Sequence, residues 1–122
     1  MATPLILATT HRAHEGSGDA FRRAAEAYAA FVERSEPGLI ALVVTSDDAS
    51  VTFWHVFADA GSADEHLTTS AGHIAESFAI AETVRILVVG SPGPRVTGLL
   101  AANREAGVPA DAIEAVNGFV RT

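Results

Sequence analysis

Two neighbouring segments of the chain are apolar on both faces, and this pattern constrains the fold more than any other feature. The turn-forming triplet Glu36-Pro37-Gly38 precedes two predicted strands, 39–45 and 51–58, which are joined by a short polar turn over 46–50. Successive side chains of a strand point to opposite faces, and here both faces are apolar. Because an antiparallel pair in water normally has one polar face, this pair needs helices over one side and a second cover over the other.

Charge and length exclude several classes of partner. The 122 residues carry 15 acidic and 8 basic side chains, with a net charge of -7 at pH 7, and the largest basic cluster is the pair Arg22-Arg23. Nucleic acid and anionic membranes are therefore not expected partners. No apolar run approaches the ~20 residues of a membrane span, and the start, Met1-Ala2-Thr3-Pro4, lacks the basic region of a secretion signal. We expect a soluble, cytoplasmic protein.

Two residue types with distinctive chemistry, cysteine and lysine, do not occur in the sequence. Without cysteine, the chain cannot use a thiolate nucleophile, a cysteine-ligated metal or a disulfide. Without lysine, since all basic residues are Arg, Schiff-base catalysis and the phosphate-binding lysine of a Walker loop are also excluded.

The order of the predicted elements indicates the architecture. It is a strand over 4–10, a polar loop over 11–18, an amphipathic helix capped by Ser17 or Asp19, the hairpin, a helix capped at Ser62 with Glu65 three residues later, and a strand over 83–89. This βαββαβ order is typical of an α+β, ferredoxin-like fold with a four-stranded antiparallel sheet and two helices on one face. The other face remains open, and two such faces meeting across a twofold axis would form a barrel-like homodimer.

The remainder of the chain is expected to be an extension of a 1–92 domain. Gly90-Ser91-Pro92-Gly93-Pro94 ends the last strand, and 93–122 has too few apolar residues for a domain of its own. A short helix is predicted around 96–100, a turn at 107–109 and an extended end at 117–120. This extension is expected to pack on the body or on the partner subunit.

Several short motifs together resemble the antibiotic biosynthesis monooxygenase-like family of dimeric α/β barrels. The similarity covers roughly residues 4–92, and the ending over 118–121 resembles an uncharacterised bacterial subgroup. The motifs are Glu36-Pro37-Gly38 with its hairpin, Phe57-Ala58-Asp59, the 62–66 helix start followed by Leu67, and the 83–90 strand followed by Pro92.

The resemblance implies a chemistry as well as a fold. Named members oxygenate quinol-like or polyketide aromatics without flavin or metal, so no cofactor is expected. Such a site must exclude water, hold an aromatic ring and assist deprotonation. Haem-degrading relatives use an Asn, a Trp and a His, but here Asn103 and Asn117 lie outside the core and Trp54 lies on a strand. Haem binding is therefore the third choice.

The histidines are the candidate acid–base groups. His66 and His73 lie seven residues apart on one predicted helix, so their α-carbons are about 10.5 Å apart, which disfavours a shared metal ion. Both fall on the flank of the apolar stripe, either as solvated side chains or as a base at a pocket mouth, and His66 is the stronger candidate. His55 interrupts an apolar strand face, as a bonded core histidine or as a cavity-facing acid or base. The pair His11 and His14 is expected to be exposed.

The candidate ligand-binding groups are His73 on the predicted helix and four residues of the strands. Phe53, Phe57 and Trp54 are either core residues or the walls against which an aromatic ligand stacks. Arg85, the single charge in the last strand, either pairs with an acidic group or binds an anionic substrate.

Two main functional hypotheses follow. The first is a cofactor-independent monooxygenase with His66 and His55 as catalytic groups. The second is a non-catalytic homodimer that binds a small hydrophobic or aromatic ligand or acts as a scaffold. A cavity of a few hundred Å³ reached by a histidine would favour the first, and a space filled by side chains the second.

Overall fold

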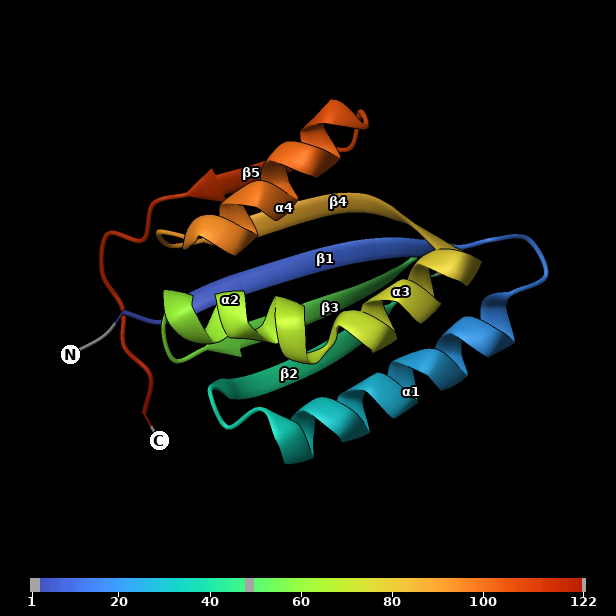
Figure 1. Ribbon diagram of the computed structural model, residues 1–122, viewed down its shortest axis with the longest axis horizontal. Helices are drawn as coiled ribbons and strands as arrows, with labels where there is room; N and C mark the ends of the chain where they lie inside the picture. Colours follow the sequence, from blue (N-terminus) through green and yellow to red (C-terminus); the bar gives the residue numbers. More distant parts are fainter. Residues whose placement is uncertain (1–2, 48–49, 122) are drawn as a thin grey trace.

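A computed structural model describes residues 3–47 and 50–121 of the chain and places them in one mixed sheet with helices on one face (Figure 1). In order along the chain, its elements are β1 (Leu5–Ala13), α1 (Gly18–Ser35), β2 (Leu39–Ser46), β3 (Val51–Phe57), α2 (Ala60–Thr69), α3 (Ala71–Ile80), β4 (Ala81–Val89), α4 (Pro94–Glu105) and β5 (Ala110–Ile113). The strand order across the sheet is β2-β3-β1-β4-β5.

The α+β, ferredoxin-like core is as expected, but the sheet has five strands rather than four. β1 to β4 pair antiparallel, whereas β5 adds at the edge parallel to β4 after the crossover helix α4. β5 spans four residues, which is too short a segment for a clear strand-like alternation in the sequence, and only Ala110 of the four is buried. The chain therefore completes one edge of the sheet with its own residues 110–113. Residues 114–121 form no helix or strand, and the expected extended end is not a strand.

One face of the sheet is covered by helices in a single layer (Figure 1). The amphipathic helix expected after the polar loop is confirmed as α1, whose buried positions form an apolar stripe, Phe21, Ala25, Tyr28 and Val32. The opposite end of this layer packs α2 and α4 against β1 and β4, around Leu5, Leu7, Val88, Val96 and Leu100. These two clusters hold the sheet and helices together on either side of the centre of the helical layer.

The second predicted helix is two helices that meet at Ser70. α2 ends at Thr69 and α3 begins at Ala71, with the Ser70 N–H bonded to the His66 carbonyl at 2.9 Å. The prediction of Ser62 as the N-cap is wrong, because the helix begins three residues earlier. Asp59 is the N-cap, and its side chain accepts the Ser62 N–H at 2.7 Å.

The first strand is longer than predicted. β1 continues to Ala13, where its pairing with β4 passes through an irregularity between Thr10 and His11. This extension moves His11 from the expected loop into the sheet, whereas His14 lies beyond the strand and is exposed. The structure therefore contradicts the prediction of exposure for His11 only.

The other face of the sheet has no helix over it among the described residues. Val43 is 58% and Trp54 44% exposed there, and the two residues are direct partners in the β2–β3 pairing. Asp48 and Ala49 of the predicted 46–50 turn lie outside the described residues. No helix in the described part of the chain is long and apolar enough to cross a membrane.

Candidate active site

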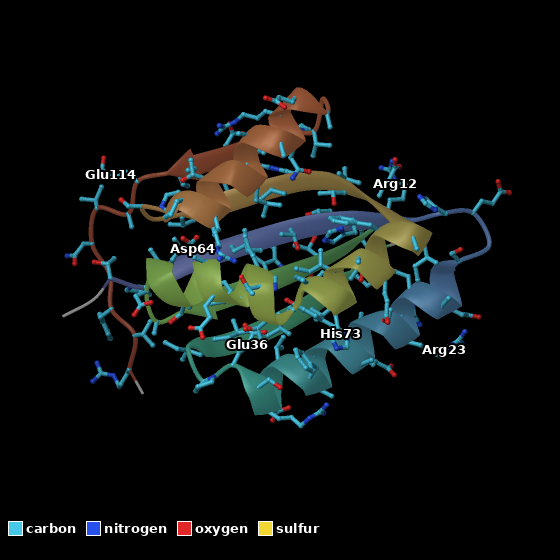
Figure 2. All side chains as sticks on the ribbon, in the orientation of Figure 1. Arg12, Arg23, Glu36, Asp64, His73 and Glu114 are labelled. Atoms are coloured by element: carbon cyan, nitrogen blue, oxygen red, sulfur yellow. The ribbon has the colours of Figure 1, made fainter. Side chains whose placement is uncertain are left out.

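A cavity of about 330 Å³ lies between the sheet and the helices. Its walls are mainly apolar and come from β1, β3, β4 and all four helices. The apolar lining is Leu7, Phe53, Leu67, Ala71, Ile74, Ala75, Phe78, Ile86 and Leu99, and the polar lining is Thr9, His11, Tyr28, His55, His66, His73, Ser77 and Thr83. Figure 2 shows the labelled His73 between α1 and α3. The cavity therefore concentrates four histidines and a tyrosine within an apolar wall.

A continuous series of hydrogen bonds runs through the buried side chains beside this cavity. The Tyr28 hydroxyl lies 2.5 Å from His55 Nε2 and 2.9 Å from His66 Nε2, and His66 Nδ1 lies 2.7 Å from Glu36 Oε1. Ser70 donates its hydroxyl to Glu36 Oε2 at 2.6 Å. We call these five residues, Glu36, His66, Tyr28, His55 and Ser70, the buried network.

Each member of the buried network comes from a different part of the fold. Tyr28 projects from the buried stripe of α1, His55 from the cavity face of β3 and His66 from α2. Glu36 directly follows α1, and Ser70 occupies the junction between α2 and α3. Packing of α1 against α2 and α3 therefore brings these side chains together.

The direction of the hydrogen bonds follows from His55. Its Nδ1 lies 2.8 Å from the Leu7 carbonyl, which only accepts, so Nδ1 carries a proton. Burial, together with the nearby His66, lowers the pKa of His55 to about 3, so the ring is neutral and its Nε2 accepts. The Tyr28 hydroxyl must then donate to His55 and accept from His66 Nε2.

A proton count shows how the remaining bonds are completed. Three hydrogen bonds join Glu36, His66, Tyr28 and His55, and the His55 proton is already used on Leu7. Neutral Tyr28 and His66 supply two protons, so one more is needed, shared by His66 and Glu36. Without it, one buried contact would place two lone pairs together, at a cost of about 1–3 kcal/mol. The proton gives the His66–Glu36 pair zero net charge, which suits its burial.

Burial sets the protonation of the other cavity groups. It raises the pKa of Tyr28, with a smaller contribution from the charge of Glu36, so the hydroxyl keeps its proton. Burial lowers the pKa of His66, and the charge and hydrogen bond of Glu36 oppose this shift. Burial also lowers the pKa of His11 to about 4, leaving a neutral ring that contacts Thr9 Oγ1 at 3.0 Å.

The structure brings together four of the predicted site residues. His55, His66, His73 and Phe53 all line the cavity. The interpretation of His66 as a solvated flank residue is wrong, because α1 covers that flank and leaves the side chain 2% exposed. Phe57 stacks on His55, with ring centroids 5.7 Å apart, but belongs to the core beneath the cavity rather than to its wall.

Two predicted binding residues lie away from the cavity. Trp54 alternates with Phe53 and His55 along β3 and therefore points to the open sheet face, where its Nε1 donates to Thr45 Oγ1 at 2.8 Å. Arg85 is exposed and pairs in register with Thr10 of β1. The side chain of the preceding residue, Thr9, faces the cavity, so Thr10 and Arg85 lie on the opposite face of the sheet. Neither side chain can contact a ligand in the cavity.

Sequence reasoning missed Tyr28, Glu36, Ser70 and His11 as site residues. Tyr28 reads as one more apolar member of a helical stripe, and Glu36 as part of a turn. The available signal was that each of these residues has a polar side chain, which needs a hydrogen-bond partner wherever it is buried. Within residues 3–47 and 50–121, no three His, Cys, Asp or Glu side chains are placed to hold one metal ion.

Solved structures share this fold at low sequence identity. MupZ from Pseudomonas fluorescens is 21% identical with a TM-score of 0.75, over 97% of this chain and 94% of that one. SnoaB from Streptomyces nogalater, a cofactor-independent oxygenase, is 17% identical with a TM-score of 0.64, over 76% and 97%. A putative antibiotic biosynthesis monooxygenase from Caulobacter crescentus is 15% identical with a TM-score of 0.64, over 71% and 88%.

These similarities support the resemblance to antibiotic biosynthesis monooxygenase-like proteins at the level of the fold. No protein-family model matches the sequence, and no curated protein is significantly similar to it.

Proposed function

We propose that this protein is a cofactor-independent monooxygenase that acts on a small aromatic or quinol-like substrate bound in the cavity. The observation that carries the proposal is the Tyr28 hydroxyl held between His55 and His66 at the wall of a 330 Å³ apolar cavity. The shared fold with SnoaB supports an oxygenase more than other acid–base chemistry.

The cavity suits a compact planar substrate. Its volume is within the range of small-molecule sites, and the apolar side chains that face it can exclude water from a bound ring. Phe53, whose ring packs edge-on against Tyr28 with centroids 5.4 Å apart, offers an aromatic wall next to the polar groups. A substrate hydroxyl pointing at Tyr28 would lie among the three side chains that can move a proton.

The residues of the network would prepare the substrate to reduce oxygen itself. When the network has lost its shared proton, Tyr28 together with His66 accepts the proton of the substrate hydroxyl, and the substrate anion gives electrons to O₂. One oxygen atom enters the substrate as a new carbonyl, and the other leaves as water with two hydrogens of the substrate. All electrons come from the substrate, so no other reductant is required. His55 holds the Tyr28 hydroxyl in place.

The proposal includes a homodimer formed through the open sheet face. Val43 and Trp54 leave an apolar surface there that a second copy of the chain would cover. Because the cavity lies on the helical side, the twofold contact would stiffen the sheet that forms its floor without contributing to its lining.

Oxygen consumption tests the proposal. Protein treated with a chelator is mixed with a panel of hydroquinones and hydroxylated polycyclic aromatics, and oxygen is followed with an electrode. We expect uptake above the uncatalysed rate with at least one member, unchanged by added flavin or metal. An exposed-histidine variant, His14→Gln, should match the wild type. Rates equal to buffer across the panel would refute the proposal for this substrate class.

A second candidate is a ligand-binding homodimer without turnover. Among the described residues, no buried side-chain nitrogen or oxygen lacks a hydrogen-bond partner, so no substrate is needed to complete the buried network. Aromatic compounds that bind in the cavity, as read from quenching of tyrosine fluorescence, but never consume oxygen would favour this function.

A further inference from the structure

The buried network has one end in the cavity and the other at the molecular surface. Tyr28, His55 and His66 line the cavity, whereas Glu36 does not. Glu36 instead borders two surface depressions of about 90 and 630 Å³, one beside the start of β2 and α2 and one beside α1 and β2. No residue that lines either depression also lines the cavity. Glu36, with 7% of its side chain exposed, is therefore the member of the network that lies next to the surface.

Every link between these two ends can carry a proton. The donor–acceptor distances from His55 to Glu36 are 2.5, 2.9 and 2.7 Å. His66 connects the links through both ring nitrogens, because Nε2 faces Tyr28 and Nδ1 faces Glu36. An imidazole that gains a proton on one nitrogen can release one from the other. Uptake of a proton from the cavity restores the shared proton and the third hydrogen bond of the network, and its release at Glu36 removes them again.

A ligand bound in the cavity would favour this route over proton transfer through water in the cavity. Much of the cavity wall is apolar, so a ring that fills the cavity would displace water from it, and the network would then connect the ring to the surface through hydrogen-bonded groups. The other titratable groups facing the network are His11 of β1 and His73 of α3 on the cavity side, and Glu33 of α1 and Glu65 of α2 beside the depressions.

We infer that the network is a proton conduit, in which Tyr28 and His66 pass a proton between a cavity ligand and Glu36, and Glu36 exchanges it with solvent. The inference rests on the proposed function for the source of the proton, which is the substrate hydroxyl. Its route depends on geometry alone, so it can be tested without turnover. Glu36 is a relay and positioning residue, because it acts on the cavity through His66.

The test measures how fast the His66 imidazole N–H protons and the Tyr28 hydroxyl proton exchange with water, by NMR on protein with isotope-labelled histidine and tyrosine. The His55 N–H is not on the route, because the Leu7 carbonyl holds it. Glu36→Gln keeps the shape and a hydrogen bond to His66 but cannot take up a proton. We expect exchange at His66 and at the Tyr28 hydroxyl to slow by about tenfold or more, the scale of a lost proton-transfer group. The matched control Glu65→Gln, at the rim of the same depression, should exchange as the wild type does.

A second variant cuts the conduit in the middle. In Tyr28→Phe, exchange at His66 should stay as in the wild type, because Glu36 still connects His66 to the surface. This expectation keeps the inference testable if Glu36→Gln fails to fold. Wild-type exchange at His66 and at the Tyr28 hydroxyl in Glu36→Gln, or slowed exchange at His66 in Tyr28→Phe, would overturn the conduit.

The two proposals can fail separately. If proton exchange depends on Glu36 but the protein never consumes oxygen, the conduit is supported and the monooxygenase proposal is refuted. If the protein consumes oxygen but proton exchange does not depend on Glu36, the monooxygenase proposal is supported and the conduit is refuted.

Discussion

At the scale of single residues, the Tyr28 hydroxyl is the group on which the site depends. It joins His55 to His66, and its ring packs edge-on against Phe53. Tyr28→Phe keeps the packing and removes only the oxygen. We expect steady-state oxygen consumption to fall about a hundredfold or more, the scale of a lost general acid–base group, with a smaller change in the apparent affinity for substrate.

The same variant should be less stable. His55 and His66 would each lose a buried partner, which is expected to lower the free energy of unfolding by about 1–3 kcal/mol in denaturant titrations. A loss of activity without any loss of stability would indicate that water replaces the hydroxyl.

His55 makes the fold sensitive to acid. It is held neutral, with a pKa of about 3 in the folded protein against 6.5 unfolded, so the unfolded chain binds more protons as the pH falls. The stabilisation is complete above pH 6.5, and about 3 kcal/mol of it should be lost by pH 4. The pKa of His11 is also lowered by burial, so His11 should add to the loss of stability at low pH.

Denaturant titrations across this pH range check the expectation. His55→Gln, which cannot titrate, should flatten the dependence, and His14→Gln should not. Equal slopes for the wild type and His55→Gln would mean that other groups cause the acid sensitivity.

Part of the site was readable from residue types and part was not. The alternation of Phe53, His55 and Phe57 correctly placed one face of β3, because strand periodicity depends only on the local backbone. The environment of His66 was not predictable in the same way. A helical wheel gives the angle of a side chain, whereas its burial depends on α1, which comes from a distant part of the sequence.

At the scale of elements, α4 is held by a side chain of another helix. The Asp64 carboxylate of α2 accepts the backbone N–H of Val96 at 2.9 Å and of Arg95 at 3.2 Å, so it caps the first turn of α4. Gly93 allows this approach, since a Cβ there would collide with the Asp64 side chain.

Asp64→Ala should therefore lower the free energy of unfolding by about 1–2 kcal/mol, because α4 loses its cap. Asp64→Asn should lose less, since an amide oxygen still accepts. Thermal unfolding measures both, with Asp111→Ala on the exposed β5 edge as control. If Asp64→Ala unfolds like the Asp111 variant, the contact does not hold α4.

The long elements were predictable and the short ones were not. The stripe of α1 and the alternation of β1 and β3 extend over enough residues to define a period. β5 has four residues, three of them exposed, and becomes a strand only because β4 offers an unpaired edge. The division between α2 and α3 carries no proline, and Gly72 follows it rather than marking it.

At the scale of the whole molecule, the uncovered sheet face predicts self-association. Val43→Arg and Trp54→Arg each place a charge on this face and should convert a dimer into a monomer. Sedimentation at micromolar concentration measures the change, and Arg22→Glu on the exposed side of α1 is the control. A monomeric wild type would refute the dimer and leave the cavity, which lies on the helical side, unaffected.

The central claim is that the cavity promotes oxygen insertion without a cofactor. The most direct measurement is turnover, under isotope-labelled O₂ and in the presence of chelator, of whichever compound of the panel is consumed, with the product analysed by mass spectrometry. We predict one labelled oxygen atom in the product, the second in water, and loss of the labelled product in Tyr28→Phe. Product oxygen derived from water, or labelling that requires added metal or flavin, would contradict the claim.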